Sequence, residues 1–213
     1  MSTVTVEQVA SLVIGFNNGH ILISHTNPIT GSTVHHINAD TAQLVAEQTV
    51  AAATKDIPLP YLLASIAIES AFDSEARNCN RGPFGSNPGN DPLGYDEGLC
   101  QFKTRYLIGQ HGIKNVEEAL AFSRDVKRAV PHMVSLLTTK LQDARGVIAA
   151  GLPSVADNLW RNPYVLAAAE YNFGASGGTK MARSAKPVPG HCTTIIKFEQ
   201  RFAGQLGLPS VFA

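Results

Sequence analysis

A single glutamate stands near the end of a strongly apolar stretch, YLLASIAIESAF, which covers residues 61–72. In a helix, Leu62, Ile66 and Glu69 are spaced at i, i+4 and i+7, so this carboxyl group shares a face with residues suited to a core. Burial disfavours the ionised form and raises the pKa of a carboxyl group, which keeps a proton available near neutral pH. Glu69 is therefore a candidate general acid, the group that cleavage of a glycosidic bond requires. The alternative is a solvated glutamate at the rim of the helix.

Two stretches downstream of Glu69 complete a pattern. EGLCQF covers residues 97–102 and follows a long loop, and AAAEYNFGASG covers residues 167–177 at the close of an alanine-rich helix. With ESAF at 69–72, they resemble in order and approximate spacing the three signature motifs of lytic transglycosylases related to goose-type lysozyme. The resemblance extends over about residues 57–206.

The resemblance implies a function and a set of site residues. The family cleaves the β-1,4 bond between N-acetylmuramic acid and N-acetylglucosamine in peptidoglycan, without metal or cofactor, and leaves a 1,6-anhydro product. Glu69 matches its single catalytic carboxylate, which serves first as acid and then as base. The substrate-binding positions that the motifs imply are Ser70, Gly98, Leu99, Gln101, Tyr171 and Asn172.

Departures from the family pattern keep two alternatives open. Cys100 stands where the family usually has methionine, and Glu170 stands where a small residue is common. The segment 73–97 is longer than the family's link and holds several carboxylates, namely Asp73, Glu75, Asp91, Asp96 and Glu97. A second carboxylate at the right separation, with Asp96 and Glu97 as the candidates, would activate water and make the protein an inverting muramidase. A glycan-binding or structural virion component without catalysis is the other alternative.

The elements expected to position these residues are mostly helices. Apolar spacing predicts a helix over residues 3–16, and alternating residues predict a short hairpin or ordered loop over 17–38. Residues 58 and 60 are prolines, which stop one helix and open the next, so the Glu69 helix is expected from Leu59 to Phe72. Loop is predicted over 73–97 and a helix from near Leu99. Further helices are expected over 41–55, 116–130, 132–150, 154–161, 163–173 and 193–206, with a break or kink at Pro131.

These elements indicate a mainly α fold of the lysozyme-like (goose-type/lytic transglycosylase) kind with at most a small β-hairpin. We expect an N-terminal helix and hairpin/loop extension over residues 1–40, which could bind a virion or secretion-system partner. A catalytic domain over residues 41–213 is expected to form one continuous body with it.

Composition restricts the partners. Lys plus Arg equals Asp plus Glu at 17 each, so no basic surplus indicates nucleic acid. No apolar run approaches the roughly 18 residues that cross a bilayer. The first residues have no positive n-region, so we expect synthesis in the cytoplasm without a signal peptide. Action on peptidoglycan then needs delivery by phage lysis, a virion or a secretion system.

Other chemical signals are set aside. GASGG at 174–178 fits G-x-S-x-G around Ser176, but a nucleophile elbow needs a preceding strand, and this stretch follows a predicted helix. The seven histidines lack metal-ligand spacing and are interpreted as surface or structural. The three cysteines are in no redox or metal spacing and are interpreted as packed thiols, although one disulfide is compatible with the spacing.

Overall fold

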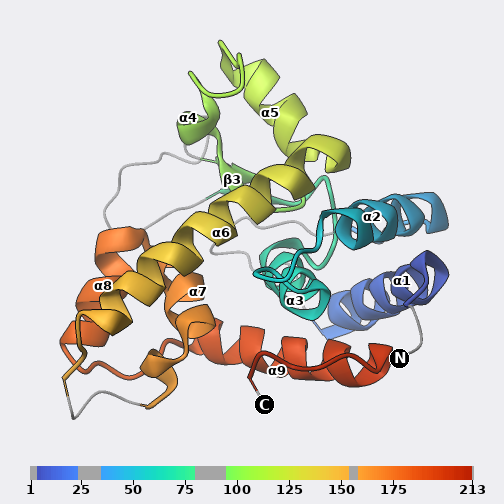
Figure 1. Cartoon of the computed structure of the whole chain (residues 1–213). Coiled ribbons are helices and arrows are strands. Elements are labelled where there is room, and N and C mark those ends of the chain that lie inside the picture. The colour runs from blue at the N-terminus through green and yellow to red at the C-terminus, as the bar shows by residue number, and fades with distance from the viewer. Residues whose placement is uncertain (1–3, 24–34, 80–94, 154–157, 213) are drawn as a thin grey trace. The chain divides into compact units, whose positions relative to one another are not determined.

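The computed structural model describes residues 4–23, 35–79, 95–153 and 158–212. Most of these residues are helical, which confirms the prediction of a mainly α protein (Figure 1). The chain divides into two compact units, one of Met1–Ala51 with Glu69–Pro131 and one of Ala52–Ile68 with His132–Ala213. Among the described helices, none combines the length and hydrophobicity that crossing a bilayer requires.

The first unit combines helices with a small sheet. Strands β1 (Arg77–Cys79), β2 (Tyr95–Glu97) and β3 (Phe102–Lys103) form an antiparallel sheet in the order β1-β2-β3. Arg77 lies opposite Glu97 across the first pair, and Glu97 lies opposite Phe102 across the second. The helices of this unit are α1 (Val6–Ile23), α2 (Ala39–Ala52), α4 (Thr104–Leu107), α5 (Val116–Arg124) and the start of α6 (Val126–Ala149).

The position of the β structure differs from the prediction. Residues 17–23, expected in a hairpin or loop, continue helix α1, whereas residues 24–34 of that prediction lie outside the described part. Strands β1 and β2 instead lie within the segment 73–97 that was predicted as loop, and β3 follows it. Acidic residues are rare in strands, so the Tyr-Asp-Glu of β2 gave no β signal. Glu97 is stabilised in its strand by side chains from other parts of the chain, described below. Asn17 is likewise stabilised in helix α1 by partners distant in sequence.

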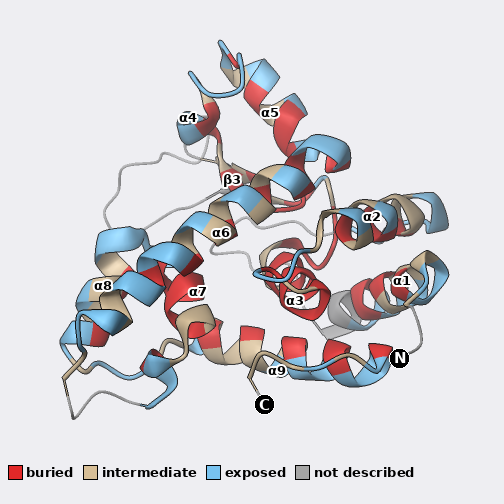
Figure 2. Cartoon of the chain, in the orientation of Figure 1, coloured by how far each residue is buried: buried red, intermediate tan, exposed pale blue. Residues whose placement is uncertain are grey.

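The second unit is helical. It contains most of α3 (Leu59–Ser70) and α6, the short 3-10 helix η2 (Asn158–Arg161), α7 (Pro163–Phe173), α8 (Ala175–Arg183) and α9 (Gly190–Leu206). Figure 2 shows α3 buried on nearly every side, in agreement with its apolar sequence. Tyr61 of α3 is fully buried, and its hydroxyl donates to the Tyr164 carbonyl at 3.1 Å.

Two helix boundaries differ from the predictions. The break after α5 falls at Asp125, whose side chain accepts from the Lys127 amide at 3.0 Å, and α6 continues through Pro131. Pro131 lies close to the start of α6, where loss of one backbone donor costs little. Helix α8 occupies a stretch for which no helix was predicted. At Gly178 a Cβ atom would lie 2.8 Å from the Glu170 amide nitrogen, so the close approach of α8 to α7 requires glycine there.

Candidate active site

The end of α3 places Glu69 and Ser70 at a sharp reversal of the chain. Ala71 (φ 51°) and Phe72 (φ 69°) both adopt the left-handed conformation, which non-glycine residues rarely occupy and which costs about 1 kcal/mol or more each. The Ser70 hydroxyl donates to the Leu99 carbonyl oxygen at 2.7 Å. The first two sequence motifs therefore meet in the first unit.

Glu69 has the electrostatic character of a proton donor. Its side chain is half-buried. Burial raises the pKa of Glu69 to about 8, and the nearby negative charge of Asp96 contributes in the same direction. The carboxyl group therefore holds its proton at neutral pH, unlike a solvated glutamate at a helix rim.

The reversal after Glu69 is held by Asn17 of helix α1. The Asn17 side chain is fully buried, and its Nδ2 donates to the Ala71 carbonyl at 2.8 Å and the His35 carbonyl at 3.1 Å. Its Oδ1 accepts from the Ile37 amide at 3.1 Å. Sequence reasoning missed this residue. The available signal was spacing, since Asn17 continues the buried i, i+4 series of Val9 and Val13.

Replacing Asn17 with alanine is expected to lower the free energy of unfolding by about 2 to 4 kcal/mol, because three backbone groups, two of them in buried hydrogen bonds, lose their partner. Asn18→Ala is the matched control, since Asn18 is exposed and its Oδ1 lies 3.0 Å from His36 Nδ1 in an exposed hydrogen bond. Urea unfolding of both variants measures the difference. Equal midpoints for the two variants would contradict the structural role of Asn17.

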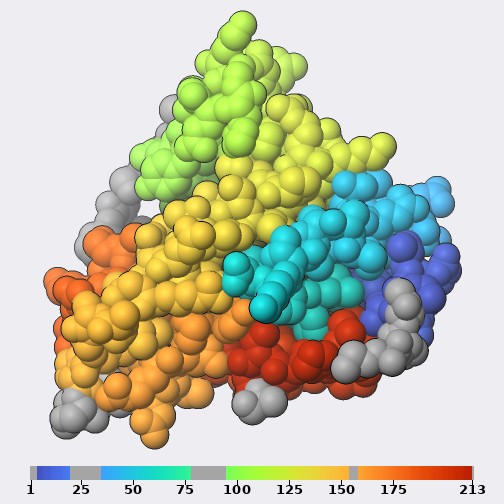
Figure 3. Space-filling model, in the orientation of Figure 1, coloured from blue at the N-terminus to red at the C-terminus, as the bar shows by residue number. Residues whose placement is uncertain are grey.

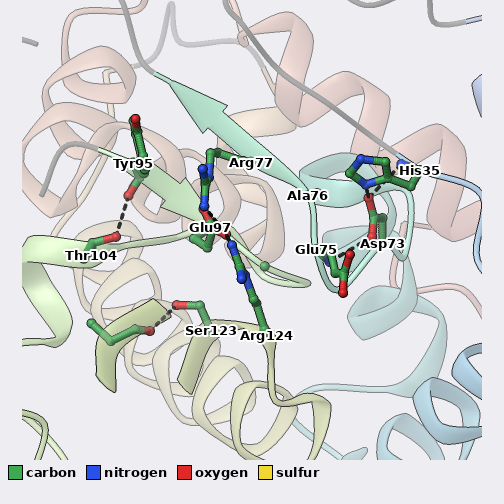
Figure 4. Close-up of polar contacts among 12 residues, drawn as sticks. His35, Asp73, Glu75, Ala76, Arg77, Tyr95, Glu97, Thr104, Ser123 and Arg124 are labelled. Carbon is green, nitrogen blue, oxygen red and sulfur yellow. Dashed lines mark hydrogen bonds and ion pairs between the residues drawn. The ribbon is translucent and has the colours of Figure 1, made fainter. Parts of the chain in front are cut away.

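Asp73 ties the same reversal to the segment after α1. Its buried carboxylate accepts from the His35 amide at 2.7 Å, from the His35 ring Nδ1 at 2.9 Å and from the Glu75 amide at 2.8 Å (Figure 4). These hydrogen bonds connect Asp73 to the backbone and ring of His35 and to the backbone of Glu75. Asp73 and His35 therefore stabilise this part of the loop.

Glu97 is enclosed by two arginines. Arg77 Nε donates to its Oε2 at 2.7 Å, and Arg124 Nε donates to its Oε1 at 2.8 Å (Figure 4). The carboxylate is completely buried, and the Arg77 guanidinium also lies 4.8 Å from the centre of the Tyr95 ring. A buried carboxylate with two cationic partners is committed to structure, so the geometry does not favour Glu97 as a base for water.

Residues 98–101 form a tight turn, not the start of the helix predicted near Leu99. Gly98 has φ +76°, and a Cβ atom there would lie only 2.0 Å from the Ser123 carbonyl oxygen. Gln101 also adopts a left-handed φ of 51°, and its Nε2 donates to the carbonyls of Ala76 at 3.0 Å and Gly98 at 2.9 Å. The backbone of Gly98 and Leu99 is thus fixed beside Ser70, with Gln101 bracing the turn.

The thiols agree with the prediction of packed cysteines where they are described. Cys100 and Cys192 are buried and form no disulfide, and the Cys79 side chain lies outside the described part. Burial, together with the charge of Glu69, raises the pKa of Cys100 well above its usual value. Cys100 is therefore a poor nucleophile, and its thiol donates to the Ala129 carbonyl at 3.8 Å.

Asp96 is the carboxylate that acts on Glu69. It is half-buried, its charge contributes to the raised pKa of Glu69, and its Oδ1 lies 3.9 Å from Lys103 Nζ. Of the two second-carboxylate candidates, Asp96 has the exposure and electrostatic contact that such a role needs. Asp91, another carboxylate of this segment, lies outside the described residues.

Tyr171 and Asn172 belong to the second unit, near the end of α7. Tyr171 is half-buried and Asn172 is exposed. The preceding Glu170 is buried and accepts from the Thr179 hydroxyl at 2.8 Å, which joins α7 to α8. The approach of Tyr171 and Asn172 to Glu69 stays a prediction. Ser176 is exposed in the first turn of α8 and follows helix α7, so the strand required for a nucleophile elbow is missing at this place.

No group of three or more His, Cys, Asp and Glu side chains in the described part of the chain is placed to hold a metal ion. The candidate site therefore consists of a protonated carboxyl group, one nearby carboxylate and a braced turn of backbone. Comparisons with protein-family models, with curated proteins and with solved structures found no match to this chain.

Proposed function

We propose that this protein is a peptidoglycan lytic transglycosylase with a lysozyme-like fold and Glu69 as its single general acid and base. The observation that carries the proposal is the state of Glu69, a half-buried carboxyl group with its pKa raised to about 8 beside the turn at Gly98. An acid that keeps its proton at neutral pH can protonate a glycosidic oxygen. The three sequence motifs support the choice of substrate and reaction, because they resemble those of the lytic transglycosylases.

The proposed reaction proceeds in two proton transfers. Glu69 donates its proton to the oxygen between N-acetylmuramic acid and N-acetylglucosamine, and the bond from this oxygen to muramoyl C1 breaks. The resulting carboxylate then accepts the proton of the muramoyl C6 hydroxyl as that oxygen bonds to C1. The nucleophile is part of the substrate, so its proximity replaces a bound water. Glu69 ends the cycle protonated.

A second candidate function, hydrolysis by an inverting muramidase, is favoured by one observation. Asp96 is near enough to Glu69 for its charge to raise the pKa of Glu69, and an inverting enzyme uses a second carboxylate as base. Asp96 also has a cationic neighbour, the Lys103 ammonium, at 3.9 Å from its Oδ1. In the transglycosylase proposal, Asp96 instead serves to keep Glu69 protonated.

Mass spectrometry of peptidoglycan digested by the purified chain separates these functions. We expect 1,6-anhydromuramoyl ends, and we expect Asp96→Asn to remain active with its alkaline loss of activity shifted to lower pH, because a negative charge near Glu69 is removed. Reducing muramic acid ends, together with an inactive Asp96→Asn variant, would establish the muramidase. Binding without any cleavage would indicate the non-catalytic alternative.

A further inference from the structure

Tyr106 exposes an aromatic ring on a firmly anchored segment of the first unit. Its side chain is 67% exposed, against 39% for Leu159 and 41% for Phe173. Its helix α4 is held by the buried residues Thr104 and Leu107, and the Thr104 hydroxyl donates to the Tyr95 carbonyl at 3.2 Å. Figure 3 shows the segment of α4 and α5, in light green, at the protein surface. The ring is therefore presented to solvent by a fixed backbone.

A lone exposed aromatic residue is common and needs no explanation. Here, however, a cation accompanies the ring, since Lys103 Nζ lies 5.8 Å from the ring centre of Tyr106. The same ammonium group lies 3.9 Å from Asp96 Oδ1, and the charge of Asp96 acts on Glu69. Lys103 and Tyr106 thus follow the turn at 98–101 within a few residues. The Lys103 ammonium interacts with Asp96, whose charge in turn acts on Glu69, the candidate acid.

We propose that Tyr106 and Lys103 form a subsite that binds an acidic muramoyl unit of the glycan strand, with the pyranose against the ring and a carboxylate at the ammonium group. The naming of this ligand rests on the proposed function. The apolar C–H face of a pyranose stacks on an aromatic ring, and the peptide stem on muramic acid supplies carboxylates. Tyrosine loses little conformational entropy when it forms such a contact.

The charges at this place match an acidic ligand. The Lys103 side chain is about one-third exposed, and the separation of its ammonium group from Asp96 exceeds that of a close charge-assisted hydrogen bond, so the ammonium group can donate to a further carboxylate. A neutral sugar would use the ring alone. The subsite therefore predicts that removing the ring weakens binding of every glycan, whereas removing the cation weakens binding of acidic glycans only.

The test measures binding in the Glu69→Gln background, which prevents cleavage during the measurement. The probes are a purified peptidoglycan tetrasaccharide with its peptide stems and a chitotetraose, which has the same length and no charge. We expect Tyr106→Ala to weaken binding of both about tenfold and Tyr106→Phe to leave it unchanged, because the ring remains. We expect Lys103→Met to weaken only the peptidoglycan fragment, about fivefold, while Lys114→Met, an exposed lysine of the same unit, has no effect.

Unchanged binding by Tyr106→Ala, or equal losses for both probes with Lys103→Met, would overturn the subsite. Thermal melting of each variant checks that the exposed positions leave the fold intact. Cleavage of peptidoglycan by the unmodified chain is measured alongside. If the unmodified chain cleaves peptidoglycan but Tyr106→Ala leaves binding unchanged, the subsite alone is overturned. If Tyr106→Ala weakens binding but the unmodified chain cleaves nothing, the proposed function alone is overturned.

Discussion

We expect Glu69→Gln to abolish the proposed peptidoglycan cleavage and at the same time to stabilise the folded chain at neutral and alkaline pH. Glutamine has the shape of a protonated glutamate but has no proton to transfer, so the rate of cleavage is expected to fall about 1,000-fold. Release of anhydromuropeptides measures this loss. Full activity in the glutamine variant would show that Glu69 is not the acid.

The gain in stability follows from the proton that Glu69 binds. In the folded chain its pKa is about 8, whereas an unfolded glutamate titrates near 4.5. As pH rises between these values, the unfolded chain releases the proton and the folded chain retains it, so the stability of the unmodified protein falls over this window. Above about pH 8 the loss is complete, and below about 4.5 it is absent.

Glutamine carries no such charge, so the stability difference between variant and unmodified chain is near zero at about pH 4 and largest at about pH 9. Since a pKa unit corresponds to about 1.4 kcal/mol, and Glu69 keeps some contact with solvent, we expect a gain on the order of 2 kcal/mol. Thermal melts at the two pH values measure it. A difference that does not change with pH would show that Glu69 titrates as a solvated residue.

In the proposed reaction, the same pKa is expected to set the alkaline limit of activity. Because the reaction needs the protonated acid, kcat/KM of the unmodified protein should decrease as pH rises through about 8. A decrease centred near pH 5 would contradict the raised pKa.

Glu97→Ala is expected to lower the free energy of unfolding by about 3 to 5 kcal/mol, the second large effect in this protein. The substitution leaves Arg77 and Arg124 facing each other without the carboxylate that they share. It also removes the anchor immediately before Gly98, so cleavage should fall together with stability. Urea unfolding and the peptidoglycan assay measure the two effects.

Two variants control this experiment. Glu117→Ala removes an exposed carboxylate from the first turn of α5 and should change stability by less than about 1 kcal/mol. Glu97→Gln keeps the shape and one acceptor oxygen, so its loss should be intermediate. If Glu97→Ala and Glu117→Ala have the same free energy of unfolding, the interaction of Glu97 with Arg77 and Arg124 does not stabilise the fold.

The sequence predicted helix ends well where the signal for the end lies within a few residues of it. Asn115 caps α5 by accepting from the Glu118 amide at 2.9 Å, and Pro163 opens α7 after the Asn162 cap. The Glu69 helix begins at Leu59 as predicted and ends two residues earlier, at Ser70. Caps and prolines determine helix ends through neighbouring backbone groups, which makes them readable in a sequence.

The parts that sequence reasoning missed depend on partners far along the chain. Glu97 tolerates burial because of Arg124 in another element, and Asn17 remains in a helix because its partners are Ala71 and Ile37. No local pattern contains these pairs. The candidate site was likewise predictable in its motifs, but the bond from Ser70 to Leu99 and the effect of Asp96 on Glu69 required coordinates.

Neither compact unit is a continuous stretch of chain. The polypeptide passes from one to the other after residues 51, 68 and 131. During synthesis the first unit therefore stays incomplete until residue 131 has left the ribosome, and Asn17 of helix α1 has no Ala71 carbonyl to bind until that residue has been made. Expressing either unit alone would require joining separated fragments, so a simple truncation exposes core residues instead of releasing a domain.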